Sequence, residues 1–225
     1  MRRRMPRIPE PEVMDEPLGA AAYARSDFSD VNQAFVDALL ARVGSLKDAR
    51  AIDLGTGPGD IPIRIALARP TWRITAVDAS APMLRFAREA ARKSGVVGKV
   101  RWLRADAKHT GLSARRFDVL FSNSILHHIT EADAFWEEVK RLGKPGAFVL
   151  LRDLARPASR AAARRIVERY GRCGPELMRR DYLNSLLASY TVSEVRKQLA
   201  RCGIGALRVK MVSDRHWDVF GRLPP

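Results

Sequence analysis

The chain has 225 residues, and its 40 lysines and arginines against 25 aspartates and glutamates give a formal net charge of +15. This length suits one large domain, and no uninterrupted apolar run reaches the roughly 18 residues that a membrane-spanning helix requires. The basic residues are scattered along the sequence, which is typical of solvated faces, although such a charge also suits an anionic substrate or a nucleic acid.

The N-terminal segment and the two cysteines argue against two further classes of protein. Basic residues near the N-terminus are not followed by an apolar stretch, which argues against a secretory signal. Cys173 and Cys202 lack the spacing of a disulfide framework or of a zinc site, so we expect no metal. These features favour a soluble cytoplasmic protein and leave its oligomeric state open.

Apolar periodicity predicts alternating strands and helices after a lead-in helix at 31–44. The expected strands lie at 50–55, 73–78, 100–106, 117–123 and 146–154, and the expected helices at 60–70, 81–95 and 131–143. Ser80 and Thr130 are expected as helix caps. Because parallel neighbours need a crossover, the alternation predicts an α/β, doubly wound sheet with helices on both faces.

The last third of the chain changes pattern. A helical, arginine-rich stretch is expected from 155 to 190, followed by a helix with a Thr191/Glu194 capping box and an antiparallel hairpin. We therefore expect a single domain, 1–225, with four parts. These are an N-terminal arm and lead-in helix or lid (1–45), a cofactor-binding core (46–154), a helical insertion over the acceptor site (155–190) and a closing helix with hairpin (191–225).

The stretch AIDLGTGPGD, residues 51–60, places Gly55, Gly57 and Gly59 directly after the first strand. Glycines let a ligand approach the backbone, and the helix that follows offers unpaired N–H groups. Acids occur near the ends of three successive strands, at Asp53, Asp78 and Asp106. In an open α/β sheet these strand ends border the ligand crevice, so we expect the three carboxylates to lie near one site.

The glycine spacing separates two classes of nucleotide ligand. The dinucleotide fingerprint is G-x-G-x-x-G and holds a pyrophosphate, whereas this loop reads G-x-G-x-G. Asp53 and Asp60 flank the loop and would repel a pyrophosphate. The pattern therefore favours a ligand with positive charge and disfavours a nicotinamide dinucleotide.

Together these motifs resemble the class I S-adenosylmethionine-dependent methyltransferases of the small-molecule type. The resemblance implies a seven-stranded Rossmann-like sheet, mostly parallel, with an antiparallel C-terminal strand. It implies S-adenosyl-L-methionine as cofactor and S-adenosyl-L-homocysteine as product. By this resemblance Gly55, Gly57 and Gly59 border the methionine and ribose, Asp53 lies near the ammonium, Asp78 binds the ribose hydroxyls and Asp106 binds the adenine amino group. The remaining expected cofactor contacts are Thr56, Ala79, Met83, Ala107, Asn123, Ser124 and the lid residue Tyr23.

Methyl transfer from a sulfonium needs an in-line nucleophile and, for some acceptors, a general base. His127 and His128 follow the fourth strand, and His216 lies in the C-terminal hairpin, so these histidines are the candidate catalytic residues. The resemblance favours a small-molecule acceptor, and Arg152, Arg179 and Arg180 hint at an anionic one. Two alternatives stay open: an RNA methyltransferase that uses the basic surface, and a cofactor-binding interaction protein without catalysis.

Overall fold

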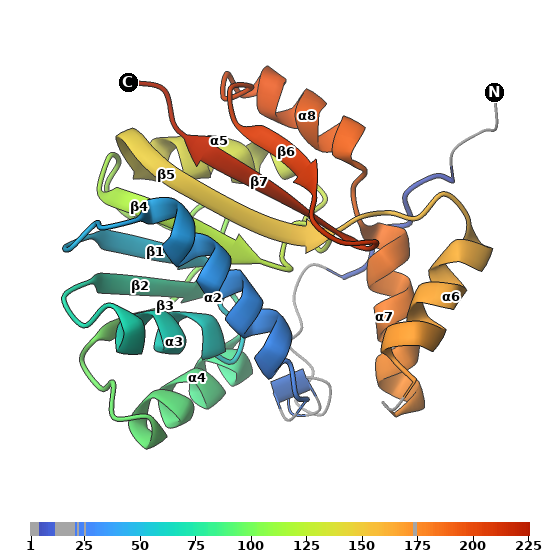
Figure 1. The fold of residues 1–225 in the computed structure, drawn as a ribbon, viewed down its shortest axis with the longest axis horizontal. Helices are drawn as coiled ribbons and strands as arrows, with labels where there is room; N and C mark the ends of the chain where they lie inside the picture. The colour runs from blue at the N-terminus through green and yellow to red at the C-terminus, as the bar shows by residue number, and fades with distance from the viewer. Residues whose placement is uncertain (1–4, 12–20, 22, 25, 173–174) are drawn as a thin grey trace.

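The computed structural model describes residues 5–11, 21, 23–24, 26–172 and 175–225. Its centre is a seven-stranded sheet in the order β3-β2-β1-β4-β5-β7-β6 (Figure 1). The pairs among β1 to β5 are parallel, whereas β7 is antiparallel to both β5 and β6. The expected α/β sheet with a reversed C-terminal strand is therefore confirmed.

The strands and helices match the expected alternation closely. The strands are β1 (Arg50–Leu54), β2 (Arg73–Asp78), β3 (Val100–Arg104), β4 (Phe117–Asn123), β5 (Gly143–Leu154), β6 (Arg208–Met211) and β7 (His216–Arg222). The helices are α2 (Ser29–Val43), α3 (Asp60–Ala68), α4 (Ala81–Lys93), α5 (Ala132–Leu142), α6 (Arg160–Tyr170), α7 (Glu176–Ala188) and α8 (Val192–Arg201).

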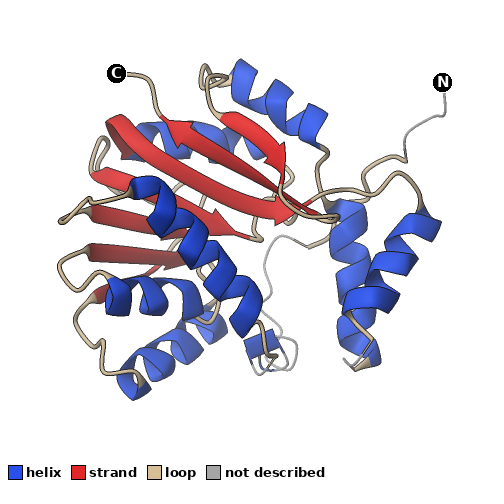
Figure 2. Cartoon of the chain, in the orientation of Figure 1, coloured by secondary structure: helices blue, strands red, loops and turns tan. Residues whose placement is uncertain are grey.

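Helices cover both faces of the sheet (Figure 2), and a hydrophobic cluster lies on each face. The cluster on one face joins α2, α3 and α4 to the strands, and the cluster on the other face joins α5 and α8 to them. Successive side chains of a strand point to opposite faces; accordingly Val119 belongs to the first cluster and Leu120 to the second. A parallel sheet covered on both faces leaves its strand ends for a ligand.

The predicted helix caps are confirmed at two positions and wrong at a third. The Ser80 hydroxyl accepts from the Met83 amide, and Thr191 and Glu194 form a capping box. Helix α5, however, is preceded by Glu131 at the N-cap, and no side-chain cap bond occurs there. The expected cap Thr130 lies one residue before that N-cap, and its backbone carbonyl, like that of Ile129, accepts from the Tyr190 hydroxyl.

Helices α6 and α7 pack against each other beyond the carboxyl ends of the central strands (Figure 1). Their apolar contacts with the end of β5 form a third, smaller cluster. The N-terminal segment 5–11 is attached there as well, since the Ile8 amide donates to the Leu187 carbonyl at 3.1 Å. Two segments far apart in sequence thus border the same end of the sheet.

Candidate functional site

The glycine loop after β1 is tied to the end of β2. The Gly57 amide donates to Asp78 Oδ2 at 2.7 Å, and the Ser80 amide donates to Asp78 Oδ1 at 2.8 Å. The Gly55 and Thr56 amides both donate to the Val77 carbonyl. These bonds fix the loop and the Asp78 carboxylate relative to each other, as a preformed ligand crevice requires.

The three positions of the loop require glycine for different structural reasons. All three have positive φ, at 77°, 55° and 82° for Gly55, Gly57 and Gly59. A Cβ on Gly55 would lie 2.3 Å from Ile125 Cδ1, and one on Gly59 would lie 2.7 Å from Trp102 Cη2. Beside Gly57 nothing lies within 4 Å of such a Cβ. Packing therefore requires the outer glycines, and the middle one leaves open space beside the backbone.

Asp53 is a buried carboxyl at the centre of the site, with 2% of its surface exposed. Burial, aided by the nearby Asp78 charge and opposed by the neighbouring Thr56 hydroxyl, raises its pKa to about 7. The buried Thr56 hydroxyl lies outside hydrogen-bond geometry with every described partner. A ligand cation next to Asp53 would favour the ionised carboxylate.

The second acid beside the loop has another role. Asp60 Oδ2 accepts from Arg64 Nε at 2.7 Å and from Asn32 Nδ2 at 2.8 Å. Its charge is thus balanced within the protein, and it ties α3 to α2. Asp60 is therefore not available to repel a pyrophosphate, contrary to the expectation from the sequence. The preference of the loop for a cationic ligand depends on Asp53 and Asp78.

The third strand-end acid, Asp106, lies two residues beyond β3 and is exposed. It accepts from the Lys108 amide at 2.8 Å and pairs with Lys108 Nζ at 3.2 Å, so it also stabilises its own turn. Ala107 and Met83 are buried, and Ala79 is half-buried. The residues expected to contact adenine thus follow the ends of β2 and β3 in the chain.

At the end of β4 the backbone is strained. Ser124 has φ 60°, a conformation that non-glycine residues rarely adopt, and its amide donates to the Arg152 carbonyl at 2.9 Å. Asn123 and Ser124 are both half-buried. Such strain clusters at functional sites, and here it turns the chain from β4 toward the two histidines that follow.

His127 is buried and held by Asp153 near the end of β5. Its Nδ1 lies 2.6 Å from Asp153 Oδ1, and its amide donates to Asp153 Oδ2 at 3.1 Å. Burial opposes the charged imidazole, but the Asp153 carboxylate outweighs that effect, so the pKa of His127 is raised. The remaining ring nitrogen, Nε2, faces Glu10 Oε1 of the N-terminal segment at 3.6 Å.

The other two candidate histidines are held neutral. Burial and the adjacent His127 lower the pKa of His128 to about 3, and burial and Arg215 lower the pKa of His216 to about 4. His216 Nδ1 lies 3.2 Å from the Ser213 hydroxyl. Because β7 begins at His216 and pairs there with Leu154, all three histidines lie at the same end of the sheet.

The predicted lid residue Tyr23 also borders this end. Its ring centroid lies 5.0 Å from that of Phe28. Burial raises the pKa of its phenol to about 12, and the carboxylates of Asp153 and Asp78 add to this effect. Tyr23 therefore brings a phenol near the acids of β2 and β5.

The arginines that hinted at an anionic acceptor have other positions. Arg152 is buried in a two-fold ion pair with Asp218, at 2.7 and 3.0 Å. Arg179 is exposed, and Arg180 is exposed beside Asp181 at 3.7 Å. These contacts stabilise the fold or face solvent, and they give no support to an anion site.

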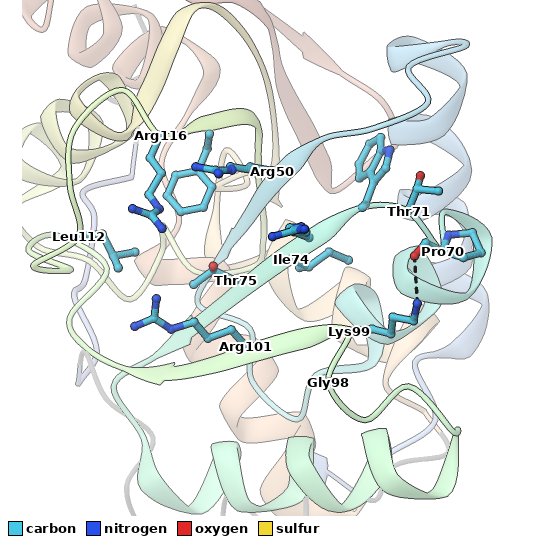
Figure 3. A pocket seen from close by; sticks show the side chains of 13 residues that line it. Arg50, Pro70, Thr71, Ile74, Thr75, Gly98, Lys99, Arg101, Leu112 and Arg116 are labelled. Atoms are coloured by element: carbon cyan, nitrogen blue, oxygen red, sulfur yellow. Dashed lines mark hydrogen bonds between the residues drawn. The ribbon is translucent and has the colours of Figure 1, made fainter.

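A cluster of cationic side chains occurs at the opposite, amino end of the sheet (Figure 3). A hollow of about 510 Å³ there is bordered by the first residues of several strands. Its basic residues are Arg50, Arg73, Lys99, Arg101 and Arg116, and none of the described residues that line it is acidic. A substantial part of the net positive charge is therefore remote from the glycine loop.

Several site residues were not expected from the sequence. Asp153 could have been found, because it lies near the end of the fifth strand just as Asp53 and Asp78 lie near the ends of theirs. Glu10 carried no such signal. It reaches the histidines across more than a hundred residues of sequence, and only the folded chain brings them together.

The chain was also compared with known proteins. Residues 51–146 match the family model described as a methyltransferase domain. Over 115 residues the chain is 27% identical to the ubiquinone/menaquinone biosynthesis C-methyltransferase UbiE of Haemophilus ducreyi, a match that covers 51% of this chain and 44% of that protein. Over 124 residues it is 31% identical to trans-aconitate 2-methyltransferase of Azoarcus sp., covering 55% of this chain and 46% of that protein.

The chain thus spans about half the length of the curated relatives it matches. Among solved structures, a SAM-dependent methyltransferase from Aquifex aeolicus superposes with a TM-score of 0.68 at 22% identity, and the match covers 92% of this chain and 98% of that one. An identity this low supports the shared fold only. No helix of the described part of the chain is long and apolar enough to cross a membrane.

Proposed function

We propose that the chain is a class I S-adenosylmethionine-dependent methyltransferase, which transfers the methyl group of S-adenosyl-L-methionine to a small-molecule acceptor by in-line displacement. The observation that carries the proposal is the bond from the Gly57 amide to Asp78, which links the glycine loop to the acid of the neighbouring strand. That arrangement suits a ligand with ribose hydroxyls and a cationic group.

The described residues fit this cofactor in three respects. Gly57 leaves space beside the backbone, Asp53 is a buried carboxyl that a ligand ammonium would help to ionise, and Asp78 supplies carboxylate oxygens, a group that accepts from hydroxyls such as those of ribose. When bound, the cofactor supplies an activated methyl group. The protein's part is to orient the cofactor and to exclude water from the transfer.

We assign the acceptor to the space near Asn123, Ser124 and His127. Among the three candidate histidines, His127 has the most specific contacts, since Asp153 fixes its ring and leaves Nε2 for other partners. His128 and His216 would border the acceptor. In this assignment the helical pair α6 and α7 covers the acceptor, and the segment with Tyr23 covers the cofactor.

One observation supports an anionic acceptor and another opposes it. The name of the Azoarcus relative contains trans-aconitate, a carboxylate. Against this, Arg152 is paired with Asp218 inside this chain, and Arg156 pairs with Glu194. The name of the Haemophilus relative contains quinones instead, so both acceptor classes belong in a screen.

The test is a methyl-transfer assay with radiolabelled S-adenosyl-L-methionine and three acceptor panels: small carboxylates, quinols and bulk RNA. Transfer to a small molecule supports the proposal. Transfer to RNA alone would replace it with the nucleic-acid alternative. Tight S-adenosyl-L-homocysteine binding together with no transfer to any panel would favour the non-catalytic alternative.

A further inference from the structure

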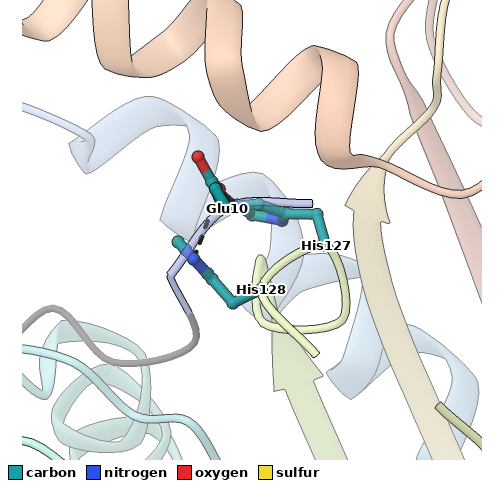
Figure 4. A group of neighbouring side chains, drawn as sticks. All are labelled: Glu10, His127 and His128. Carbon is teal, nitrogen blue, oxygen red and sulfur yellow. Dashed lines mark ion pairs between the residues drawn. The ribbon is translucent and has the colours of Figure 1, made fainter. Parts of the chain in front are cut away.

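Three side chains from two distant segments converge beyond the end of β4 (Figure 4). They are His127 and His128, which follow that strand, and Glu10 of the N-terminal segment 5–11. Their ligand atoms, one nitrogen from each imidazole and one carboxylate oxygen, all lie within 4.8 Å of one another. The family resemblance gives this cluster no role, and the sequence alone predicted no metal.

The separations within the cluster are informative. Glu10 Oε1 lies 3.3 Å from His128 Nδ1 and 3.6 Å from His127 Nε2. A charge-assisted hydrogen bond would draw such atoms to about 2.7–2.9 Å. Ligand atoms that share a tetrahedral zinc ion at bond lengths near 2.0–2.1 Å lie about 3.3 Å apart. These two separations from Glu10 are therefore long for direct bonding and close to the edge of a metal tetrahedron.

The contacts of His127 also resemble those of a histidine that binds a metal ion. Ligating histidines usually direct their other ring nitrogen to a carboxylate, which fixes the tautomer and the ring orientation. His127 Nδ1 lies 2.6 Å from Asp153 Oδ1, so donation to Asp153 leaves the lone pair of Nε2 directed toward Glu10. Asp153 is completely buried and its amide contacts hold it in place.

Other groups face the cluster from the elements around it. The Ser185 hydroxyl of α7 donates to Glu10 Oε1 at 3.0 Å, and the Pro11 carbonyl lies 3.3 Å from His128 Nδ1. The Arg7 guanidinium donates to the backbone carbonyls of His127 and Ile129, and its charge opposes a bound cation. The carboxylates of Glu10 and Asp153 offset that charge.

We infer that Glu10, His127 and His128 form a binding site for a divalent first-row transition metal ion of the zinc type. Two imidazoles and one carboxylate are a donor set that suits such ions. Three protein ligands leave a fourth position open for water. A bound ion would also fasten the N-terminal segment to the end of the sheet, because Glu10 comes from that segment.

The test uses the full chain without a histidine tag, stripped with a chelator and titrated with zinc alone. We expect one zinc ion per chain by mass spectrometry of the metal. His128→Ala and Glu10→Gln should each weaken binding at least tenfold, and His109→Ala, which changes an exposed histidine outside the cluster, should not. Cobalt in place of zinc should give the strong visible absorption of tetrahedral coordination.

Three outcomes would overturn the inference: no stoichiometric zinc binding, unchanged affinity in both cluster variants, or the weak absorption of octahedral cobalt. S-adenosyl-L-homocysteine binding is measured on every variant as a check of the fold. Glu10 and His128 are not among the expected cofactor contacts, so S-adenosyl-L-homocysteine binding should persist in all of them. Loss of the metal site and failure of the proposed function are thus separate results.

Discussion

The two ends of the central sheet differ in the ionisable side chains that they group together. Asp53, Asp78 and Asp153 lie at or near the carboxyl ends of their strands, whereas Arg50 and Arg73 begin β1 and β2 at the amino end. Asp78 accepts from backbone amides, Asp153 holds His127, and the basic residues line an open hollow. The net charge of +15 therefore says little about the glycine loop, near which Asp53 and Asp78 lie.

The largest effect is expected from Gly55→Ala at the carboxyl end. The new Cβ would meet Ile125 at 2.3 Å in a backbone with φ 77°. Overpacking and left-handed strain together should lower the free energy of unfolding by about 2–4 kcal/mol. Urea denaturation measures this. Gly57→Ala is the matched control, because its Cβ meets open space; an equal loss of stability in both variants would contradict the packing account.

Asp78→Asn should weaken S-adenosyl-L-homocysteine binding by about 1–3 kcal/mol, since it removes a charged acceptor from the crevice. Calorimetric titration measures the change. Asp118→Asn is the control from the other end of the sheet, where Asp118 accepts from the Arg50 amide and pairs with Lys144. If the Asp118 variant lost as much affinity as the Asp78 variant, the two ends would not differ as described.

Asp53 should make cofactor binding at the carboxyl end of the sheet depend on pH. Burial raises its pKa to about 7 in the free protein, and a ligand ammonium would lower it again. Binding of S-adenosyl-L-homocysteine should therefore release a proton below about pH 7, and the affinity should rise as the pH approaches 7 and level off above it. Calorimetry in buffers of different ionisation enthalpy detects the proton. Asp53→Asn should abolish the release; its persistence would assign the proton to another group.

The raised pKa of Asp53 also makes the free energy of unfolding depend on pH. A carboxyl whose folded pKa exceeds its unfolded value of 3.8 binds more protons in the folded state. Between about pH 4 and pH 7, Asp53 is ionised in the unfolded chain but still protonated in the folded protein. The free protein therefore loses stability as the pH rises through this range. Asp53→Asn should remove this part of the pH dependence of unfolding, which urea titrations at several pH values would show.

The smallest effect on the cofactor is expected at the amino end. Arg101→Glu combined with Arg116→Glu changes the charge of the hollow by four units without contacting the glycine loop. S-adenosyl-L-homocysteine affinity should stay within about 0.5 kcal/mol of the unchanged protein, while retention on a polyanion column should fall. A large loss of cofactor affinity would couple the two ends.

The sequence predicted most of the fold because its local signals agree. The Thr191/Glu194 capping box, the Ser80 cap and the alternating apolar runs each occur where the structure has the corresponding element. Where signals competed, the prediction was less accurate. Thr130 is a good capping residue by type, but α5 has Glu131 at its N-cap, and the backbone carbonyls of Ile129 and Thr130 accept from the Tyr190 hydroxyl instead.

The site could be predicted only as far as it is local. Glycines and acids at strand ends are visible in the sequence because strand order brings them together. The pairing of Asp60 with Arg64, of Arg152 with Asp218 and of Glu10 with the histidines depends on side-chain direction and on long-range docking. Those contacts changed the interpretation of the arginines and revealed the metal-ligand cluster.

The most direct test of the central claim is calorimetric titration of the full chain with S-adenosyl-L-homocysteine and, separately, with NAD. The glycine loop and the carboxylates of Asp53 and Asp78 predict one site for S-adenosyl-L-homocysteine with a dissociation constant near the micromolar range, about −8 kcal/mol, and no heat from NAD. Binding of NAD without S-adenosyl-L-homocysteine would contradict the assignment of this crevice.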